Sequence, residues 1–203
     1  MMEARLLSGD IGKPRVEALS DGLYAIALTL LVLELKLPSL GEAATNADLL
    51  HALRQLMPKV LIWLLSFVVM GVLWLSQVRV YGLVHSLSRT MVRLELAQLA
   101  FVSLMPFSTA LVGEHGNLSV AAIVYASNIL AITLTGAWRT RELLHQPRVH
   151  IQALTAPVLR TLKMRAYALP ACAAAAVVLG FTFPGWNMLA MVPMLFIPMR
   201  THA

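Results

Sequence analysis

RVEALSDGLYAIALTLLVLEL, residues 15–35, begins like the start of a soluble helix and continues as an apolar run with an acid at each end. The run between Asp21 and Glu34 holds only uncharged residues, and as a helix it covers about 18 Å at about 1.5 Å per residue. That is less than the roughly 30 Å hydrocarbon core of a bilayer. We therefore expect both acids inside or at the edge of a membrane, facing protein or water, where ionisable residues usually serve function.

The composition is typical of an integral membrane protein. Of its 203 residues, 59% are hydrophobic and 13% are charged, with a mean hydropathy of +0.75, whereas soluble domains carry about 25% charged residues. Four further runs contain no charged residue: 60–78, 96–113, 116–138 and 166–199. The segments between them are too short for a soluble domain. We therefore expect an all-α integral membrane protein, with residues 1–203 as a single transmembrane domain.

The number of helices follows from the last apolar run, which is 34 residues long and could supply two spans. Pro184 and Gly185 break it, beside the interfacial Trp186. Six transmembrane helices are predicted, at 17–37, 58–78, 92–113, 118–138, 163–182 and 186–199. A short helix at 47–56, capped by Asn46, is expected outside the membrane, and Pro106 should kink the third helix.

The basic residues predict the orientation. If both termini are cytoplasmic, only Lys36, Arg54 and Lys59 lie outside, and the other thirteen lie inside: Arg5, Lys13, Arg15, Arg79, Arg89, Arg93, Arg139, Arg141, Arg148, Arg160, Lys163, Arg165 and Arg200. This multi-pass arrangement in the plasma membrane accounts for the net charge of +6 without nucleic acid, so no nucleic-acid partner is expected.

One face of the first helix is apolar. At about 100° per residue, six side chains share a stripe about 100° wide: Gly22, Ile26, Thr29, Leu30, Leu33 and Leu37. Ser20 and Asp21 lie away from this stripe, and Glu34 lies at its margin near the outer end. Ordinary helix packing produces such a stripe as well, so periodicity alone leaves both interpretations open.

An acid at this depth needs a partner, because an unpaired carboxylate there is costly. Arg15, Trp74 and Gln77 are candidate partners of Asp21, and such contacts would hold the inner end of the first helix against the second and third. The sequence shows no internal repeat. A solute pathway is therefore expected between identical chains around a symmetry axis, not between two halves of one chain.

The opening stretch also resembles the RxxxFSDGxxAIxxTLLxLE signature of the transmembrane protein 175 family, potassium channels of lysosomes and many prokaryotes. Three further segments are similar to that family, in the same order along the chain: 72–74 with Trp74, 104–109 with Met105-Pro106-Phe107, and 124–128 with Tyr125. The resemblance covers the first four helices well, and the last two by hydropathy only.

This resemblance implies a six-helix subunit assembled as a homotetramer, with the first helix of each chain lining a central cation pore. Large aliphatic rings would close the pore at Ile26, Leu30 and Leu33, and Thr29 would supply a hydroxyl layer implicated in selectivity. Arg15, Ser20, Asp21, Trp74 and Gln77 would form a structural polar network. Glu34 would lie at the outer mouth, where four copies could attract cations.

Two positions depart from the family pattern. Leu19 stands where the family usually has Phe, which keeps apolar packing. Gln77 stands three residues after Trp74, where many members have histidine. Glutamine forms hydrogen bonds but does not titrate near neutral pH, so behaviour that depends on protonating that histidine is not expected here.

The resulting hypothesis is a potassium-preferring cation channel with a hydrophobic constriction. K⁺ is the expected permeant ion, and monovalent cations are the expected binding partners. The alternative is a proton-coupled secondary transporter that uses Asp21, Glu34 or Glu95 as carriers. An enzyme is not expected, because the sequence lacks the HExxH, GxSxG and Walker patterns. No cofactor or permanent metal is expected either.

Overall fold

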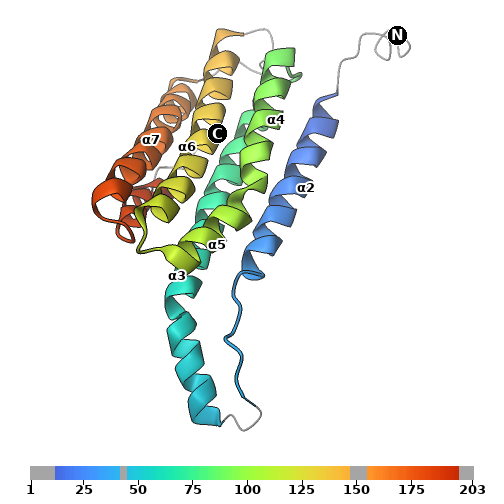
Figure 1. The fold of residues 1–203 in the computed structure, drawn as a ribbon. Helices are drawn as coiled ribbons and strands as arrows, with labels where there is room; N and C mark the ends of the chain where they lie inside the picture. Colours follow the sequence, from blue (N-terminus) through green and yellow to red (C-terminus); the bar gives the residue numbers. More distant parts are fainter. Residues whose placement is uncertain (1–11, 42–44, 147–154, 197–203) are drawn as a thin grey trace.

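The computed structural model describes residues 12–41, 45–146 and 155–196, and helices make up most of this part of the chain. The elements are α2 (Lys13–Val32), α3 (Asn46–Gly82), α4 (Arg89–Ser103), α5 (Met105–His115), α6 (Ser119–His145), α7 (Ala156–Thr182), the 3-10 helix η2 (Asn187–Met191) and the single turn α8 (Pro193–Phe196). The long helices run in alternating directions along the chain, with α4 and α5 continuing one another (Figure 1).

Four helical stretches in the described residues are long and apolar enough to cross a membrane: α3, α4 with α5, α6, and α7. The first expected span, α2, is not among them, because Arg15, Glu17 and Asp21 lie within its 20 residues. Its length of about 30 Å nevertheless matches a hydrocarbon core. The charges of α2 therefore have to be accommodated by its neighbours in the bundle.

The core lies where α6 packs between α4 and α7, with α2 and α3 against α4 and α5 (Figure 1). Its fully buried side chains include Tyr24, Met70, Met105 and Tyr125. Residues from most of the long helices thus share this apolar cluster.

The region between α2 and α3 differs from the expected spans. The first helix was expected to reach residue 37, but it ends at Val32. The Leu33 N–H bonds to the Leu30 carbonyl, an i→i−3 bond that is tighter than the i→i−4 bond of an α-helix, and Pro38 cannot continue a helix. The helix expected at 47–56 and the span expected at 58–78 are one continuous helix, α3, with Pro58 inside it. Its N-terminal half extends beyond the other helices (Figure 1).

The N-terminus of α3 is capped by Thr45, where the sequence pattern favoured Asn46. The Thr45 side chain accepts from the backbone N–H of Asp48, and the Asp48 carboxylate accepts from the Thr45 N–H at 2.8 Å, which forms a capping box. Asp48 also accepts from the Thr45 hydroxyl at 2.7 Å. These bonds satisfy donors that would otherwise be orphaned at the exposed end of α3.

The third expected span, 92–113, is interrupted between α4 and α5 at Leu104. Pro106 in the first turn of α5 lacks a backbone N–H, so the i→i−4 ladder cannot pass through it. The Leu104 N–H bonds instead to Phe101 O at 3.1 Å, and the Ser108 hydroxyl donates to Met105 O at 3.1 Å. The proline therefore produces a kink between α4 and α5.

At the opposite end of the bundle, α6 runs past the expected limit of residue 138 and α7 begins before the expected 163. Arg139 to His145 holds no proline or glycine to stop the helix. The added turns bury Leu143 and Leu162 in a second cluster with Val80, Val84 and Met91. Packing of this cluster therefore carries both helices beyond the apolar runs.

The sixth expected helix, 186–199, is replaced in the described residues by η2 and α8, because Pro193 interrupts the ladder. Together Asn187–Phe196 would reach about 15 Å, half of a hydrocarbon core, and residues 197–199 lie outside the described part. Gly185 makes the preceding turn with a φ of 87°, a backbone angle that other residues adopt only with strain. Buried Asn187 then donates to Ala122 O and Ala176 O.

Candidate functional site

The helix α2 has one face that packs into the bundle. Its buried residues are Val16, Ser20, Tyr24, Ala27 and Leu31, spaced at helical intervals. They lie against α3, α4 and α5. Because Ser20 and Tyr24 are on this face, the packed side of α2 is partly polar, and it needs hydrogen-bonding partners from the neighbouring helices.

The opposite face of α2 is uncovered. Ile26 is 59% exposed, Leu30 41% and Leu33 62%, and Gly22 and Thr29 are exposed beside them; Leu37 is also exposed but lies beyond the end of α2. Every member of the stripe expected from periodicity thus lies on the uncovered side of the protomer. A contiguous apolar face of this kind requires lipid or another protein chain as its neighbour.

Thr29 is the hydroxyl within this stripe. Its Oγ1 donates to the Ile26 carbonyl at 2.8 Å, one turn earlier on the same helix. The hydroxyl proton is therefore committed to the backbone, while the oxygen keeps its lone pairs as an acceptor. At this position α2 presents an oxygen acceptor between large aliphatic side chains.

The Asp21 carboxylate accepts a hydrogen bond from a side chain of α3. The indole Nε1 of Trp74 donates to Asp21 Oδ1 at 2.8 Å, and the carboxylate itself is exposed. Arg15, another candidate partner, is exposed, and six residues of helix place it about 120° around the axis from Asp21. Of the three candidates named for Asp21, the structure brings Trp74 to its carboxylate.

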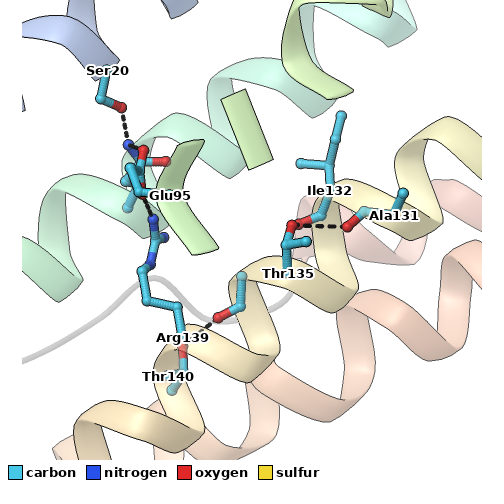
Figure 2. Close-up of polar contacts among 9 residues, drawn as sticks. Ser20, Glu95, Ala131, Ile132, Thr135, Arg139 and Thr140 are labelled. Atoms are coloured by element: carbon cyan, nitrogen blue, oxygen red, sulfur yellow. Dashed lines mark hydrogen bonds and ion pairs between the residues drawn. The ribbon is translucent and has the colours of Figure 1, made fainter. Parts of the chain in front are cut away.

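Behind α2 a buried chain of polar contacts crosses the bundle (Figure 2). The Gln77 amide donates to the Ser20 hydroxyl on α2 and to Glu95 Oε1 on α4, the latter at 2.7 Å. Glu95 Oε2 in turn accepts from Arg139 Nη1 on α6, in an ion pair whose side chains are 0% and 3% exposed. The chain therefore links α2, α3, α4 and α6.

An aromatic ring lies beside this ion pair. The Arg139 guanidinium lies 5.5 Å from the centroid of the Tyr81 ring, within cation–π distance, and Tyr81 is buried. A buried ion pair needs such additional contacts, because desolvating two charges is expensive. Arg139 thus has both an acid and a ring to stabilise its charge.

Sequence reasoning had not assigned Glu95 and Arg139 to the polar network. Each lies at one end of an apolar run and looked like a boundary residue, and Glu95 entered only as a proton carrier in the transporter alternative. The two are 44 residues apart in sequence. Their common position, directly next to the end of an apolar run, was the available signal, but it does not identify a partner.

Glu34 lies beyond the end of α2 and is half-buried. It lines a small pocket with Lys59 and Trp63 of α3 and with Glu114 of α5. This pocket lies at the end of the bundle opposite the Glu95–Arg139 pair. Two acids and one lysine leave a net negative charge there.

A second buried hydrogen-bonded cluster joins α3, α5 and α6. The Ser66 and Tyr125 hydroxyls lie 2.9 Å apart, Thr109 donates to Ser66 at 3.1 Å, and Asn128 donates to Ser108 at 3.2 Å. These side chains connect the three helices through hydrogen bonds. Among the described residues no group of three His, Cys, Asp or Glu side chains could hold a metal ion.

Comparison with known proteins identifies relatives of this chain. A family model described as "Endosomal/lysosomal potassium channel TMEM175" matches residues 15–106, which include α2, α3 and α4. A Streptomyces collinus protein named a potassium channel is 35% identical over 72% of this chain and 74% of its own length. A Chamaesiphon minutus potassium channel is 39% identical, over 59% of this chain and 60% of its own length.

Longer vertebrate proteins match as well. The Gallus gallus protein named an endosomal/lysosomal proton channel is 32% identical over 69% of this chain, which spans only 30% of that protein. Among solved structures, a lysosomal potassium-selective channel homologue from Chamaesiphon minutus superposes with a TM-score of 0.77 at 30% identity, covering 94% of this chain and 98% of the other. The helical arrangement described above is therefore shared with that channel.

Proposed function

Because the chain belongs to the TMEM175 potassium-channel family, a family of ion channels and not of enzymes, we propose that it is a potassium-preferring cation channel whose pore is lined by α2. The observation that carries this proposal is the uncovered stripe of Ile26, Leu30 and Leu33 around Thr29. No other helix described in the protomer covers this face, which lies on the C-terminal half of α2.

A pore of this kind requires several copies of the chain. We expect a homotetramer in the bilayer, with the same face of α2 from each subunit placed around the central axis by cyclic symmetry. The exposure of the stripe in a single protomer supports this arrangement. Native mass spectrometry of the detergent-purified protein should report four subunits, and a monomer that still conducts would overturn the central pore.

Conduction through such a pore depends on the aliphatic rings. Carbon side chains from Ile26, Leu30 and Leu33 replace little of an ion's hydration, so a narrow ring excludes water and closes the pore. When the ring widens, a cation that loses its water easily passes more readily. Potassium is therefore preferred to sodium, and the Thr29 oxygen offers a hydrogen-bond acceptor at the same level.

Glu34 is proposed to lie near the outer mouth. Its pocket carries two acids against Lys59, so each subunit contributes net negative charge to that end of the pore. Fourfold repetition would raise the local cation concentration, an effect that weakens as ionic strength rises.

The decisive test is the reversal potential of purified protein in a planar bilayer under opposed potassium and sodium gradients. A channel of the proposed type gives a current whose reversal potential lies near the potassium equilibrium potential. A reversal potential at zero under these gradients would show that potassium is not preferred.

The alternative, a proton-coupled secondary transporter, requires an acid free to exchange protons. Glu95 is held by Arg139 and Gln77, and Asp21 accepts from Trp74. Glu34, the third candidate carrier, lines a pocket with Lys59 at one end of the bundle. Potassium flux from liposomes should therefore run down its gradient without a pH gradient. Flux that requires a pH gradient would favour the transporter.

A further inference from the structure

Three arginines mark the same end of the bundle. Arg79 directly follows the apolar run 60–78, Arg139 follows 116–138, and Arg165 precedes 166–199. Because α3 and α6 end where α7 begins, the alternating helices bring these positions to one level (Figure 1). This level is the membrane boundary, where lipid phosphate groups lie.

Two of these arginines line a cavity of about 50 Å³ between α3, α4, α6 and α7. Its wall includes Ser76, Gln98, Arg139, Thr140 and Arg165. A cavity of this size holds more than one water molecule, because a single water needs about 10 to 15 Å³. The cavity therefore has room for a small polar ligand.

The arginine donors at this cavity are not all satisfied. Arg165 is 7% exposed, and its Nε and Nη2 are buried without a hydrogen-bond partner among the described residues. Arg139 Nε is also without a partner there, although Nη1 binds Glu95. Unpaired buried guanidinium donors cost free energy, so they indicate a missing acceptor.

Charge leads to the same conclusion. Arg79 lies close enough to Arg165 to repel its guanidinium, and Arg79 Nη1 is itself buried without a partner among the described residues. Glu95 is engaged by Arg139 and Gln77, and the sequence 147–154 between α6 and α7 contains no Asp or Glu. A neighbouring anion would remove the repulsion and supply the acceptors.

We propose that this cavity binds a phosphate-type oxyanion, held by Arg165 and the spare donor of Arg139, with the charge of Arg79 next to Arg165 favouring the anion. Planar guanidinium groups suit the oxygens of a phosphate, which accept several N–H donors at once. The phosphate comes from a phospholipid headgroup at the membrane boundary or from free inorganic phosphate. The site is separate from the stripe of α2 and does not depend on which ion crosses the pore.

The test measures thermal stability of the purified protein in neutral detergent against inorganic phosphate, with chloride at matched ionic strength as control. A second series adds phosphatidylglycerol or a phosphate-free galactolipid to the micelles. Binding raises Tm with ligand concentration. A rise with inorganic phosphate assigns the free anion, and a rise with phosphatidylglycerol alone assigns the headgroup. No rise in either series overturns the proposal.

Arg165→Gln should lower the apparent affinity at least about tenfold, because it removes charged donors. Without added anion this variant should melt no lower than wild type, since it relieves repulsion from Arg79. The matched control is Arg160→Gln, an exposed arginine on the same helix, which should respond as wild type. Arg79→Gln provides a second variant if Arg165→Gln does not fold. A wild-type response from the folded variant would overturn the site.

Discussion

The indole nitrogen of Trp74 on α3 lies 2.8 Å from the carboxylate of Asp21 on α2, so the acid in the apolar helix is tied to its neighbour by one aromatic donor. The contact lies beside the buried contacts of Ser20 and Gln77, which join the same two helices. The contact between Asp21 and Trp74 therefore helps to fix how α2 is rotated about its own axis. That rotation decides which residues form the uncovered face.

Trp74→Phe removes this donor while keeping an aromatic side chain. We expect a loss of about 1 kcal/mol in unfolding free energy. A hydrogen bond to a charged group stabilises more than one between neutral groups, but Asp21 is exposed, and competition from water weakens the bond. The measurement is the Tm in detergent. Trp63→Phe is the control, because Trp63 Nε1 has no partner among the described residues. Equal losses would contradict a role for the Trp74–Asp21 bond.

Ile26→Asn tests the hydrophobic constriction. An amide in the ring lets water and hydrated ions pass, so potassium leak from liposomes should rise and the preference over sodium should fall. Val32→Asn makes the same kind of change at an exposed position about 110° away from the centre of the stripe, and it should leave selectivity unchanged. Currents of Ile26→Asn identical to wild type would remove Ile26 from the constriction.

The Glu95–Arg139 pair predicts a strongly non-additive response. Arg139→Met leaves a buried carboxylate without its cation and should cost about 3 to 5 kcal/mol, whereas the double variant Glu95→Leu with Arg139→Met should recover much of that loss. Chemical unfolding of four proteins checks this: wild type, Glu95→Leu, Arg139→Met and the double variant. The exposed Arg141→Met is the matched control and should be near neutral. Additive losses would show that the two residues are not coupled.

The capping box predicts a pH effect at the exposed end of α3. Hydrogen bonds from the Thr45 hydroxyl and then its backbone N–H hold the pKa of Asp48 below its usual value. Because the folded pKa is depressed, the contribution of Asp48 is present above its unfolded pKa of about 3.9 and is lost as pH falls through the folded value. Thr45→Val removes the capping hydroxyl and should speed hydrogen exchange over residues 46–50. Thr90→Val, at an exposed position of α4, should not change exchange there.

Orientation can be tested with single cysteines, because Cys172 is the only native one. His85 and Asn117 are exposed in loops at opposite ends of the bundle. If both termini are cytoplasmic in the plasma membrane, a membrane-impermeant maleimide on intact cells should label Asn117→Cys and not His85→Cys. The reverse pattern would invert the topology.

The stripe on α2 could be predicted because helical periodicity follows from spacing alone. Any helix through Ile26 and Leu33 places these residues together, whatever surrounds them. Trp74 and Gln77 were candidate partners of Asp21 because an unpaired carboxylate is costly, and the structure places Trp74 against Asp21 and Gln77 against Ser20. The start of α3 and the form of the sixth helix were less predictable, because Pro58 is accommodated within a helix whereas Pro193 interrupts one.

By itself, the sequence determined that the chain is a helical membrane protein, that its basic residues mark one end, and which face of α2 is apolar, since each property depends on composition or on spacing within one segment. The tertiary structure decided that this face stays uncovered, that Glu95 meets Arg139, and that Arg165 lies at a cavity with unused donors. These contacts join residues tens of positions apart. They depend on how each helix is rotated against its neighbours, which side-chain packing sets and sequence spacing does not.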